Sequence, residues 1–200
     1  MAITAEMVKQ LREKTGAAMM DCKKALQDAS GDEQKAVQLL REKGMAVAAK
    51  REGKTASEGL VEQYIHTGGK IGVLVELNCE TDFVARTDDF KELAKELAMH
   101  ISWTKPEYIS RAEIPAEVIE REKAIHMQWA QNEGKPEAAL PKIVEGRMEK
   151  LFFQVVCLLD QPFIKDQDRS IGDVISEKVG KLGEKIVVKR FVRLRVGEDA

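Results

Sequence analysis

Cysteine is scarce in this sequence, and long apolar runs are missing. The 200 residues include three cysteines, Cys22, Cys79 and Cys157. They lack the paired spacing of a zinc site and are too few for the disulfide framework of a secreted domain, so we expect reduced thiols in a cytoplasmic protein. No segment approaches the roughly 20 apolar residues of a membrane span, and residues 1–10 follow a helical pattern without the anatomy of a signal peptide. We expect no membrane association.

An excess of positive charge is also absent. The 34 acidic residues slightly outnumber the 32 basic ones, for a formal net charge of -2. Proteins that bind nucleic acid usually concentrate lysine and arginine, so we expect no direct nucleic-acid partner. The sequence does hold 44% hydrophobic and 33% charged residues, which is typical of a soluble globular protein with a helical surface. Its length allows one or two domains.

Residues 1–44 are predicted to form a bundle of three short helices. Apolar residues recur three and four positions apart, Thr4 is placed as an N-cap, and Gly16 is placed as a left-handed stop. The third helix is expected to end at Gly44. Three helices in so few residues share only a small core.

Two adjacent methionines in this bundle, Met19 and Met20, cannot both lie on the same face of a helix. We expect one of them to be exposed, with Arg12 nearby, because flexible methionine side chains suit an adaptable contact surface. The alternative is that the small bundle partly buries both.

Residues 45–58 are small and charged, with no clear apolar face after Val47. This composition predicts a linker or a frayed helix tail. Gly53-Lys54-Thr55 matches the end of a phosphate-binding loop, but the glycine required five positions earlier is Ala48. We therefore reject nucleotide binding here and place a separate core at 59–200.

The core is predicted to be α+β. Alternating apolar residues indicate a β-hairpin that pairs 60–66 with 71–77. A last strand over 186–196, whose apolar face is interrupted at Arg190, is expected to join it in one sheet. Helical patterns occur over 90–101, 115–132, 143–155 and 170–179, and 158–166 is expected to be a loop. The predicted architecture is a small antiparallel three-stranded sheet packed with helices.

The segment 78–86 joins the hairpin to the long helix. Thr81 and Thr87 can each act as an N-cap, and two caps six residues apart predict a short helical turn before the long helix. That turn would push Asp82 and Phe83 outward. The alternative, in which Phe83 packs in the core, is equally compatible with the composition.

No catalytic group stands out. Cys79 is the nucleophile with ionisable neighbours, and the adjacent carboxylates Glu80 and Asp82 would raise the pKa of its thiol, which opposes catalysis. The three histidines are scattered and form no Ser–His or Cys–His pattern. We therefore predict no catalytic residues, no enzyme activity and no metal site.

Two long motifs resemble the elongation factor Ts family. One is NCETDFVAR at Asn78–Arg86, and the other combines LREKTG at Leu11–Gly16 with MMDCKKAL at Met19–Leu26. They occur in the family's order, and the sequence near the C-terminus is similar as well. The resemblance implies an N-terminal bundle of the ubiquitin-associated type. It also implies a guanine nucleotide exchange factor whose partner is the GTPase elongation factor Tu, in its GDP-bound and nucleotide-free forms.

The resemblance further implies roles for two sets of residues. One set, which we call the wedge residues, enters the GTPase beside its Mg²⁺ site and disturbs the coordination of metal and phosphates: Thr81, Asp82, Phe83 and Val84. The second set, which we call the docking residues, leans on a helix of the GTPase nucleotide domain: Arg12, Met19 and Met20. Mg²⁺ and GDP belong to the GTPase, so the chain would carry no cofactor of its own.

One departure from the family concerns length. Longer members carry a second core subdomain and a coiled-coil insertion, and 200 residues leave full room for neither. The chain thus resembles the short form of the family, for which a homodimer stays open. The alternative function is a helical adaptor that binds ubiquitin-like or peptide partners, but it would leave the 78–86 junction and the core without a role.

Overall fold

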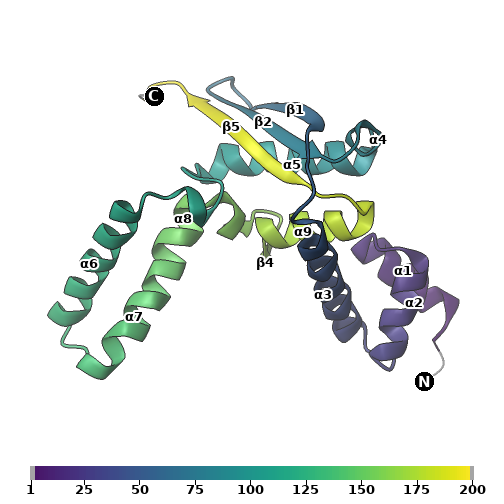
Figure 1. Ribbon diagram of the computed structural model, residues 1–200, viewed down its shortest axis with the longest axis horizontal. Coiled ribbons are helices and arrows are strands. Elements are labelled where there is room, and N and C mark those ends of the chain that lie inside the picture. The colour runs from purple at the N-terminus through teal and green to yellow at the C-terminus, as the bar shows by residue number, and fades with distance from the viewer. Residues whose placement is uncertain (1–2, 199–200) are drawn as a thin grey trace. The chain divides into compact units, whose positions relative to one another are not determined.

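A computed structural model describes residues 3–198 (Figure 1). The chain divides into two compact units, each assembled from separate stretches of sequence. Unit 1 comprises the residues up to Glu62 together with Val75–Glu96 and Asp173–Phe191, and unit 2 comprises Gln63–Leu74, Leu97–Gly172 and the residues from Val192 onward. Unit 1 thus includes the N-terminal bundle together with later segments, so the division into a bundle at 1–44 and a separate core at 59–200 stays a prediction. None of the helices between residues 3 and 198 has both the length and the apolar composition needed to cross a membrane.

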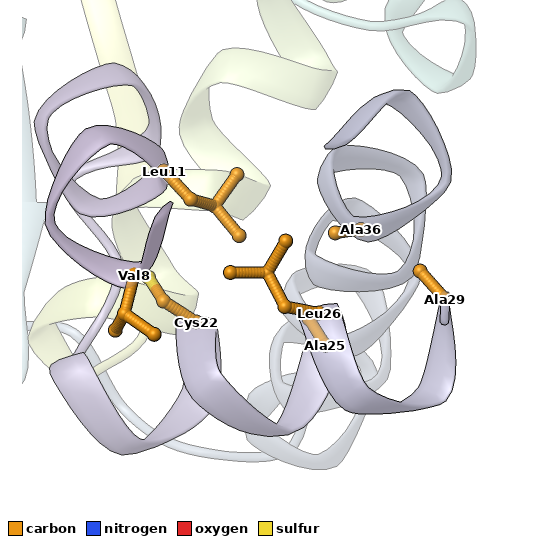
Figure 2. Close-up of a cluster of buried hydrophobic side chains, with 7 residues drawn as sticks. All are labelled: Val8, Leu11, Cys22, Ala25, Leu26, Ala29 and Ala36. Carbon is orange, nitrogen blue, oxygen red and sulfur yellow. The ribbon is translucent and has the colours of Figure 1, made fainter. Parts of the chain in front are cut away.

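Three helices of unit 1 form the N-terminal bundle: α1 (Ala5–Thr15), α2 (Met19–Asp28) and α3 (Glu33–Arg51). α1 begins as predicted, because the Thr4 hydroxyl accepts a hydrogen bond from the Met7 N–H. It ends at Gly16, which has a left-handed conformation with φ 66°. Figure 2 shows the small core that the helices share, which buries Val8, Leu11, Cys22, Ala25, Leu26, Ala29 and Ala36.

The third helix does not end at Gly44, as the sequence suggested, but continues to Arg51. Gly44 is buried against α9 (Ile171–Leu182), and a Cβ atom built on Gly180 of α9 would lie 2.9 Å from the Gly44 Cα atom. The two glycines therefore allow two helix backbones to approach closely. Glycine serves helix packing here, and only residues 52–57 are left as a non-helical connection to the sheet.

The predicted three-stranded antiparallel sheet is confirmed, with the strand order β1-β2-β5. Its strands are β1 (Glu58–Ile65), β2 (Ile71–Cys79) and β5 (Val187–Arg195). In β2 the alternate residues Val73, Val75 and Leu77 are buried, as the pattern predicts. The long helix α5 (Asp88–Thr104) buries its predicted stripe, which consists of Phe90, Leu93, Ala94, Leu97, Ala98 and Ile101. The fold is therefore α+β.

The last strand differs from the prediction in which residues it buries. Val188 is buried, but Lys189 and Arg190 are exposed in succession, so the alternation shifts by one residue. Three apolar side chains beyond the shift, Val192, Leu194 and Val196, are consequently exposed, whereas Phe191 is half-buried. The Arg193 side chain is only 8% exposed and pairs with Glu198 at 2.7 Å. This pairing compensates the guanidinium for its loss of water.

Unit 2 contains two packed helices, α6 (Ala116–Asn132) and α7 (Leu140–Arg147) (Figure 1). α7 runs on into a π-helical segment, Met148–Phe153, and then α8 (Gln154–Val156), where the sequence predicts one helix. The short elements of this unit are η1 (Arg111–Glu113), η2 (Glu137–Ala139), η4 (Leu158–Asp160), β3 (Pro162–Phe163) and β4 (Asp166–Ser170). Because β3 pairs with β4, the expectation of a plain loop over 158–166 is wrong. β3 has two residues and β4 is polar, so neither carries an alternating apolar pattern that a sequence could reveal.

Candidate functional site

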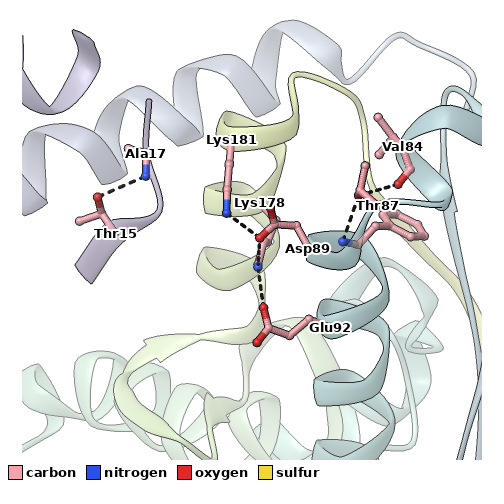
Figure 3. Close-up of polar contacts among 9 residues, drawn as sticks. Thr15, Ala17, Val84, Thr87, Asp89, Glu92, Lys178 and Lys181 are labelled. Atoms are coloured by element: carbon pink, nitrogen blue, oxygen red, sulfur yellow. Dashed lines mark hydrogen bonds and ion pairs between the residues drawn. The ribbon is translucent and has the colours of Figure 1, made fainter. Parts of the chain in front are cut away.

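The predicted wedge residues lie at α4, a short helix between β2 and α5. Thr81 precedes it in an extended conformation, and α4 spans Asp82–Ala85. The Thr87 hydroxyl accepts a hydrogen bond from the Phe90 N–H at 3.3 Å and donates one to the Val84 carbonyl at 2.8 Å (Figure 3). Thr87 therefore caps α5 and closes α4 at the same point. The predicted short helix ahead of the long one is confirmed.

Phe83 projects from α4 into solvent, with 80% of its surface exposed. Ala85 is buried, whereas Asp82 and Val84 are half-buried. One side of α4 thus contacts the core and the other presents the aromatic ring, so the alternative that placed Phe83 in the core is wrong. Large aromatic side chains are the ones that most often dominate protein–protein contacts.

The Asp82 carboxylate forms an ion pair with Arg86 one helical turn later, at 2.7 Å. The two side chains are 47% and 77% exposed, so this pair contributes little to stability. The carboxylate can therefore exchange this partner for another at low cost. α4 presents an aromatic ring beside an acidic group that another protein can reach.

The base of the junction is tied to distant segments of unit 1. The Glu80 carboxylate accepts hydrogen bonds from Arg51 Nη1 at 3.1 and 3.3 Å and from the Lys185 N–H at 2.7 Å. The Glu80 side chain is only 17% exposed, and charge-assisted bonds shielded from water are strong. Sequence analysis missed this anchor, because the partners lie 29 and 105 residues from Glu80 and no local pattern marks pairs so far apart.

The start of α5 carries a second anchor, shown in Figure 3. The Asp89 carboxylate accepts hydrogen bonds from Lys178 at 3.1 Å and Lys181 at 2.6 Å, both on α9, and Glu92 pairs with Lys178 at 3.4 Å. Partial burial acts to raise the pKa of Asp89, but the two ammonium groups outweigh it and hold the pKa below its ordinary value. Asp89 is therefore ionised at neutral pH, beside the positive N-terminal end of α5.

The predicted docking residues lie around the turn between α1 and α2. Met20 is 70% exposed, Met19 is 45% exposed, and Arg12 is exposed as well. The sequence predicts one exposed methionine, whereas the structure exposes both. The bundle core forms without them, so both side chains are available for contact with another molecule.

Within unit 1, α9 lies close both to the turn between α1 and α2, near the docking residues, and to the start of α5, which follows the wedge residues. A Cβ atom built on Gly16, which lies in the turn, would be 3.2 Å from the Lys181 Nζ atom. The same ammonium group binds Asp89 at the start of α5. α9 therefore contacts both the turn that carries the docking residues and the helix that follows the wedge.

Cys79, which lies two residues before the first wedge residue, has a thiol that is poorly suited to act as a nucleophile. Burial raises the pKa of the Cys79 thiol to about 11, and the Glu184 carboxylate adds to the shift. The predicted direction was right, but burial and a distant residue cause it, not the two neighbouring carboxylates. The thiol is protonated at neutral pH and donates to the Thr81 carbonyl at 3.1 Å. Between residues 3 and 198, no group of three or more His, Cys, Asp or Glu side chains is arranged to hold a metal ion.

Comparison with known proteins identifies the family. The family model described as Elongation factor TS matches residues 2–198. Elongation factor Ts from Moorella thermoacetica is 61% identical over 196 residues, which cover 98% of this chain and 96% of that protein. The proteins of the same name from Carboxydothermus hydrogenoformans and Desulforamulus reducens are 58% and 59% identical, over 98% of this chain and 90% of each of theirs. On this similarity across nearly its whole length, the chain belongs to the elongation factor Ts family.

Proposed function

We propose that this chain is a guanine nucleotide exchange factor that promotes GDP release from elongation factor Tu during translation. Membership of the family supports the exchange function and the partner. The exposed Phe83 ring carries the finer proposal, in which Thr81–Val84 enter the GTPase beside its Mg²⁺–GDP site. An aromatic side chain that is 80% exposed on an anchored helix is suited to fill a pocket in another protein.

Exchange of this kind requires no catalytic group on the chain. The exchange factor binds the nucleotide-free GTPase more tightly than the GDP-bound form, and by reciprocity GDP binds the complex more weakly by the same factor. Each tenfold weakening requires about 1.4 kcal/mol of differential binding. Phe83 supplies volume, and Asp82 supplies negative charge near a site that already holds phosphates. Mg²⁺ and GDP belong to the GTPase, so the chain needs no cofactor.

One aromatic side chain supplies too little differential binding for efficient exchange, so a broader surface must hold the wedge in place. We assign this docking role to Arg12, Met19 and Met20. Exposed methionines are flexible and adapt to a partner's surface, and arginine is enriched where proteins meet. The anchors described above then keep α4 oriented while the bundle is docked.

The cellular setting follows from translation. We expect the chain to act in the cytoplasm and to contact the GTPase without contacting nucleic acid, in keeping with its net charge of -2. A homodimer is compatible with this function. The oligomeric state can be measured as the mass of the chain in sedimentation experiments at the concentration of the exchange assay.

Stopped-flow release of fluorescent GDP from elongation factor Tu tests the proposal. The wild-type chain should accelerate release up to a saturating rate. The double variant Asp82→Ala/Phe83→Ala should keep its circular dichroism spectrum and lose most of the acceleration. Equal acceleration by the double variant would remove the wedge from the mechanism, and no acceleration by the wild type would overturn the exchange function. Capture of ubiquitin-like proteins in place of elongation factor Tu in a pull-down would favour the adaptor function.

A further inference from the structure

Thr81, the residue that precedes α4, is held at each of its polar atoms. The Glu184 carboxylate accepts two hydrogen bonds from it, one from the Thr81 N–H at 2.9 Å and one from the Thr81 hydroxyl at 2.6 Å. The Thr81 carbonyl accepts hydrogen bonds from the Cys79 Sγ atom at 3.1 Å and from the Ala85 N–H at 3.3 Å. Two of these four bonds come from one side chain that lies 103 residues away.

α4 is too short to determine its own direction. It has four residues, and a helix of this length is not stable by itself. A threonine at such a position usually accepts a hydrogen bond from an N–H group of the helix that follows, but the Thr81 side chain makes no such bond. Its hydroxyl donates to Glu184 instead. The Glu184 contact is therefore one of the restraints on how α4 leaves β2, and it acts at the residue where the helix begins.

Glu184 occupies a fixed position in the connection between α9 and β5. The residue before it, Gly183, has a left-handed conformation with φ 75°. The residue after it, Lys185, donates its N–H to Glu80 at 2.7 Å. Two successive residues thus fasten this connection to the end of β2 and the start of α4, all within unit 1.

We propose that Glu184 is a positioning residue for nucleotide exchange, which orients the wedge by holding Thr81 before the partner binds. This inference rests on the proposed exchange function and deepens it. A wedge that is already oriented does not have to be ordered during insertion, and such preorganisation favours the productive complex. Loss of the contact should lower the rate of GDP release at saturation. The concentration for half-maximal acceleration, which reflects docking, should stay nearly unchanged.

Two substitutions weaken the contact from opposite sides. Glu184→Ala removes both acceptor oxygens and so both hydrogen bonds from Thr81, and Thr81→Val keeps the shape of threonine without its hydroxyl and so removes one of them. Thr81→Ser keeps the hydroxyl and serves as the conservative rescue. Glu76→Ala, which removes a carboxylate that pairs with Arg190 in the same unit, is the matched control. Circular dichroism and thermal unfolding of each full-length variant establish that it is folded.

The readout is stopped-flow GDP release across a range of exchange-factor concentrations. Thr81→Val should lower the saturating rate about three- to tenfold, the effect of one lost hydrogen bond, and Glu184→Ala should lower it at least as much. The half-maximal concentration of each variant should stay within about twofold of the wild-type value. The double variant should be no slower than the slower single variant, because both changes remove one contact. Thr81→Ser should release GDP faster than Thr81→Val, because it regains the hydroxyl, and Glu76→Ala should match the wild type.

The contrary results are distinct. Wild-type saturating rates in both single variants, or an effect confined to the half-maximal concentration, would overturn the positioning role and leave the exchange function intact. A double variant slowed by the product of the two single effects would show that the residues act separately, which also contradicts the proposal. A wild-type chain without effect on GDP release would overturn the exchange function, and this inference with it.

Discussion

Truncation of Phe83 to alanine tests the proposed role of this side chain in exchange separately from any role in folding. The ring is 80% exposed, and substitutions at exposed positions usually change the free energy of unfolding by less than about 0.5 kcal/mol. The free energy of binding the GTPase should change more than this, because the ring is proposed to be buried in the complex. Full burial of a phenylalanine side chain is worth about 1.5–3 kcal/mol, and four-fifths of this surface is left to bury, which makes about 1.2–2.4 kcal/mol available. That range corresponds to about 8- to 60-fold in the saturating rate of GDP release.

The assay compares stopped-flow GDP release at saturating concentrations of wild-type chain and Phe83→Ala, alongside urea unfolding of both. Phe163→Ala is the matched control for folding, because Phe163 is only 3% exposed, and its truncation should lower the free energy of unfolding by about 3–5 kcal/mol. A release rate for Phe83→Ala within about twofold of the wild type would refute the calculation, because even the lower bound of available burial exceeds it. Destabilisation as large as that of Phe163→Ala would show that the ring belongs to the core.

Three further predictions concern docking, helix packing and pH. Met20→Glu should raise the half-maximal concentration for exchange about tenfold, because it places a charge in a desolvated contact, while helix content by circular dichroism stays unchanged. Gly180→Ala should lower the free energy of unfolding in urea by about 1–3 kcal/mol, because its Cβ atom would lie 2.9 Å from the Gly44 Cα atom. Gly146→Ala, where a Cβ atom meets open space, should cause no such loss. Burial lowers the pKa of His100, although a hydrogen bond to its Nε2 acts in the opposite sense. As the pH falls, His100 is therefore protonated in the unfolded chain before it is in the folded chain, and the free energy of unfolding should fall below pH 6.5. Urea midpoints measured above and below that pH check the sign, and the control His100→Gln should lose part of the pH dependence.

Local chemistry was enough to predict most of the elements. The Thr4 cap, the left-handed Gly16 and the alternation of Val73, Val75 and Leu77 each depend on residues close together in the chain. Such features are visible in a sequence because the periods of helix and strand are short. The resemblance carried by the two motifs also supplied the predicted wedge and docking residues, whose roles stay predictions. Composition could not decide whether Phe83 is buried, because the same apolar ring serves a core or an interface.

The tertiary structure decided which partners each segment meets. Gly44 looks like a helix stop in the sequence, but it is a point of close approach to Gly180, and only the packing of α3 on α9 distinguishes the two. The burial of the last strand changes where Lys189 and Arg190 are both exposed, which the period of a regular strand does not predict. The hydrogen bonds that Thr81 donates to Glu184 join residues 103 positions apart. A sequence pattern reports which face of an element is apolar and how its ends are capped, whereas contacts between distant residues exist only once the chain has folded and brought them together.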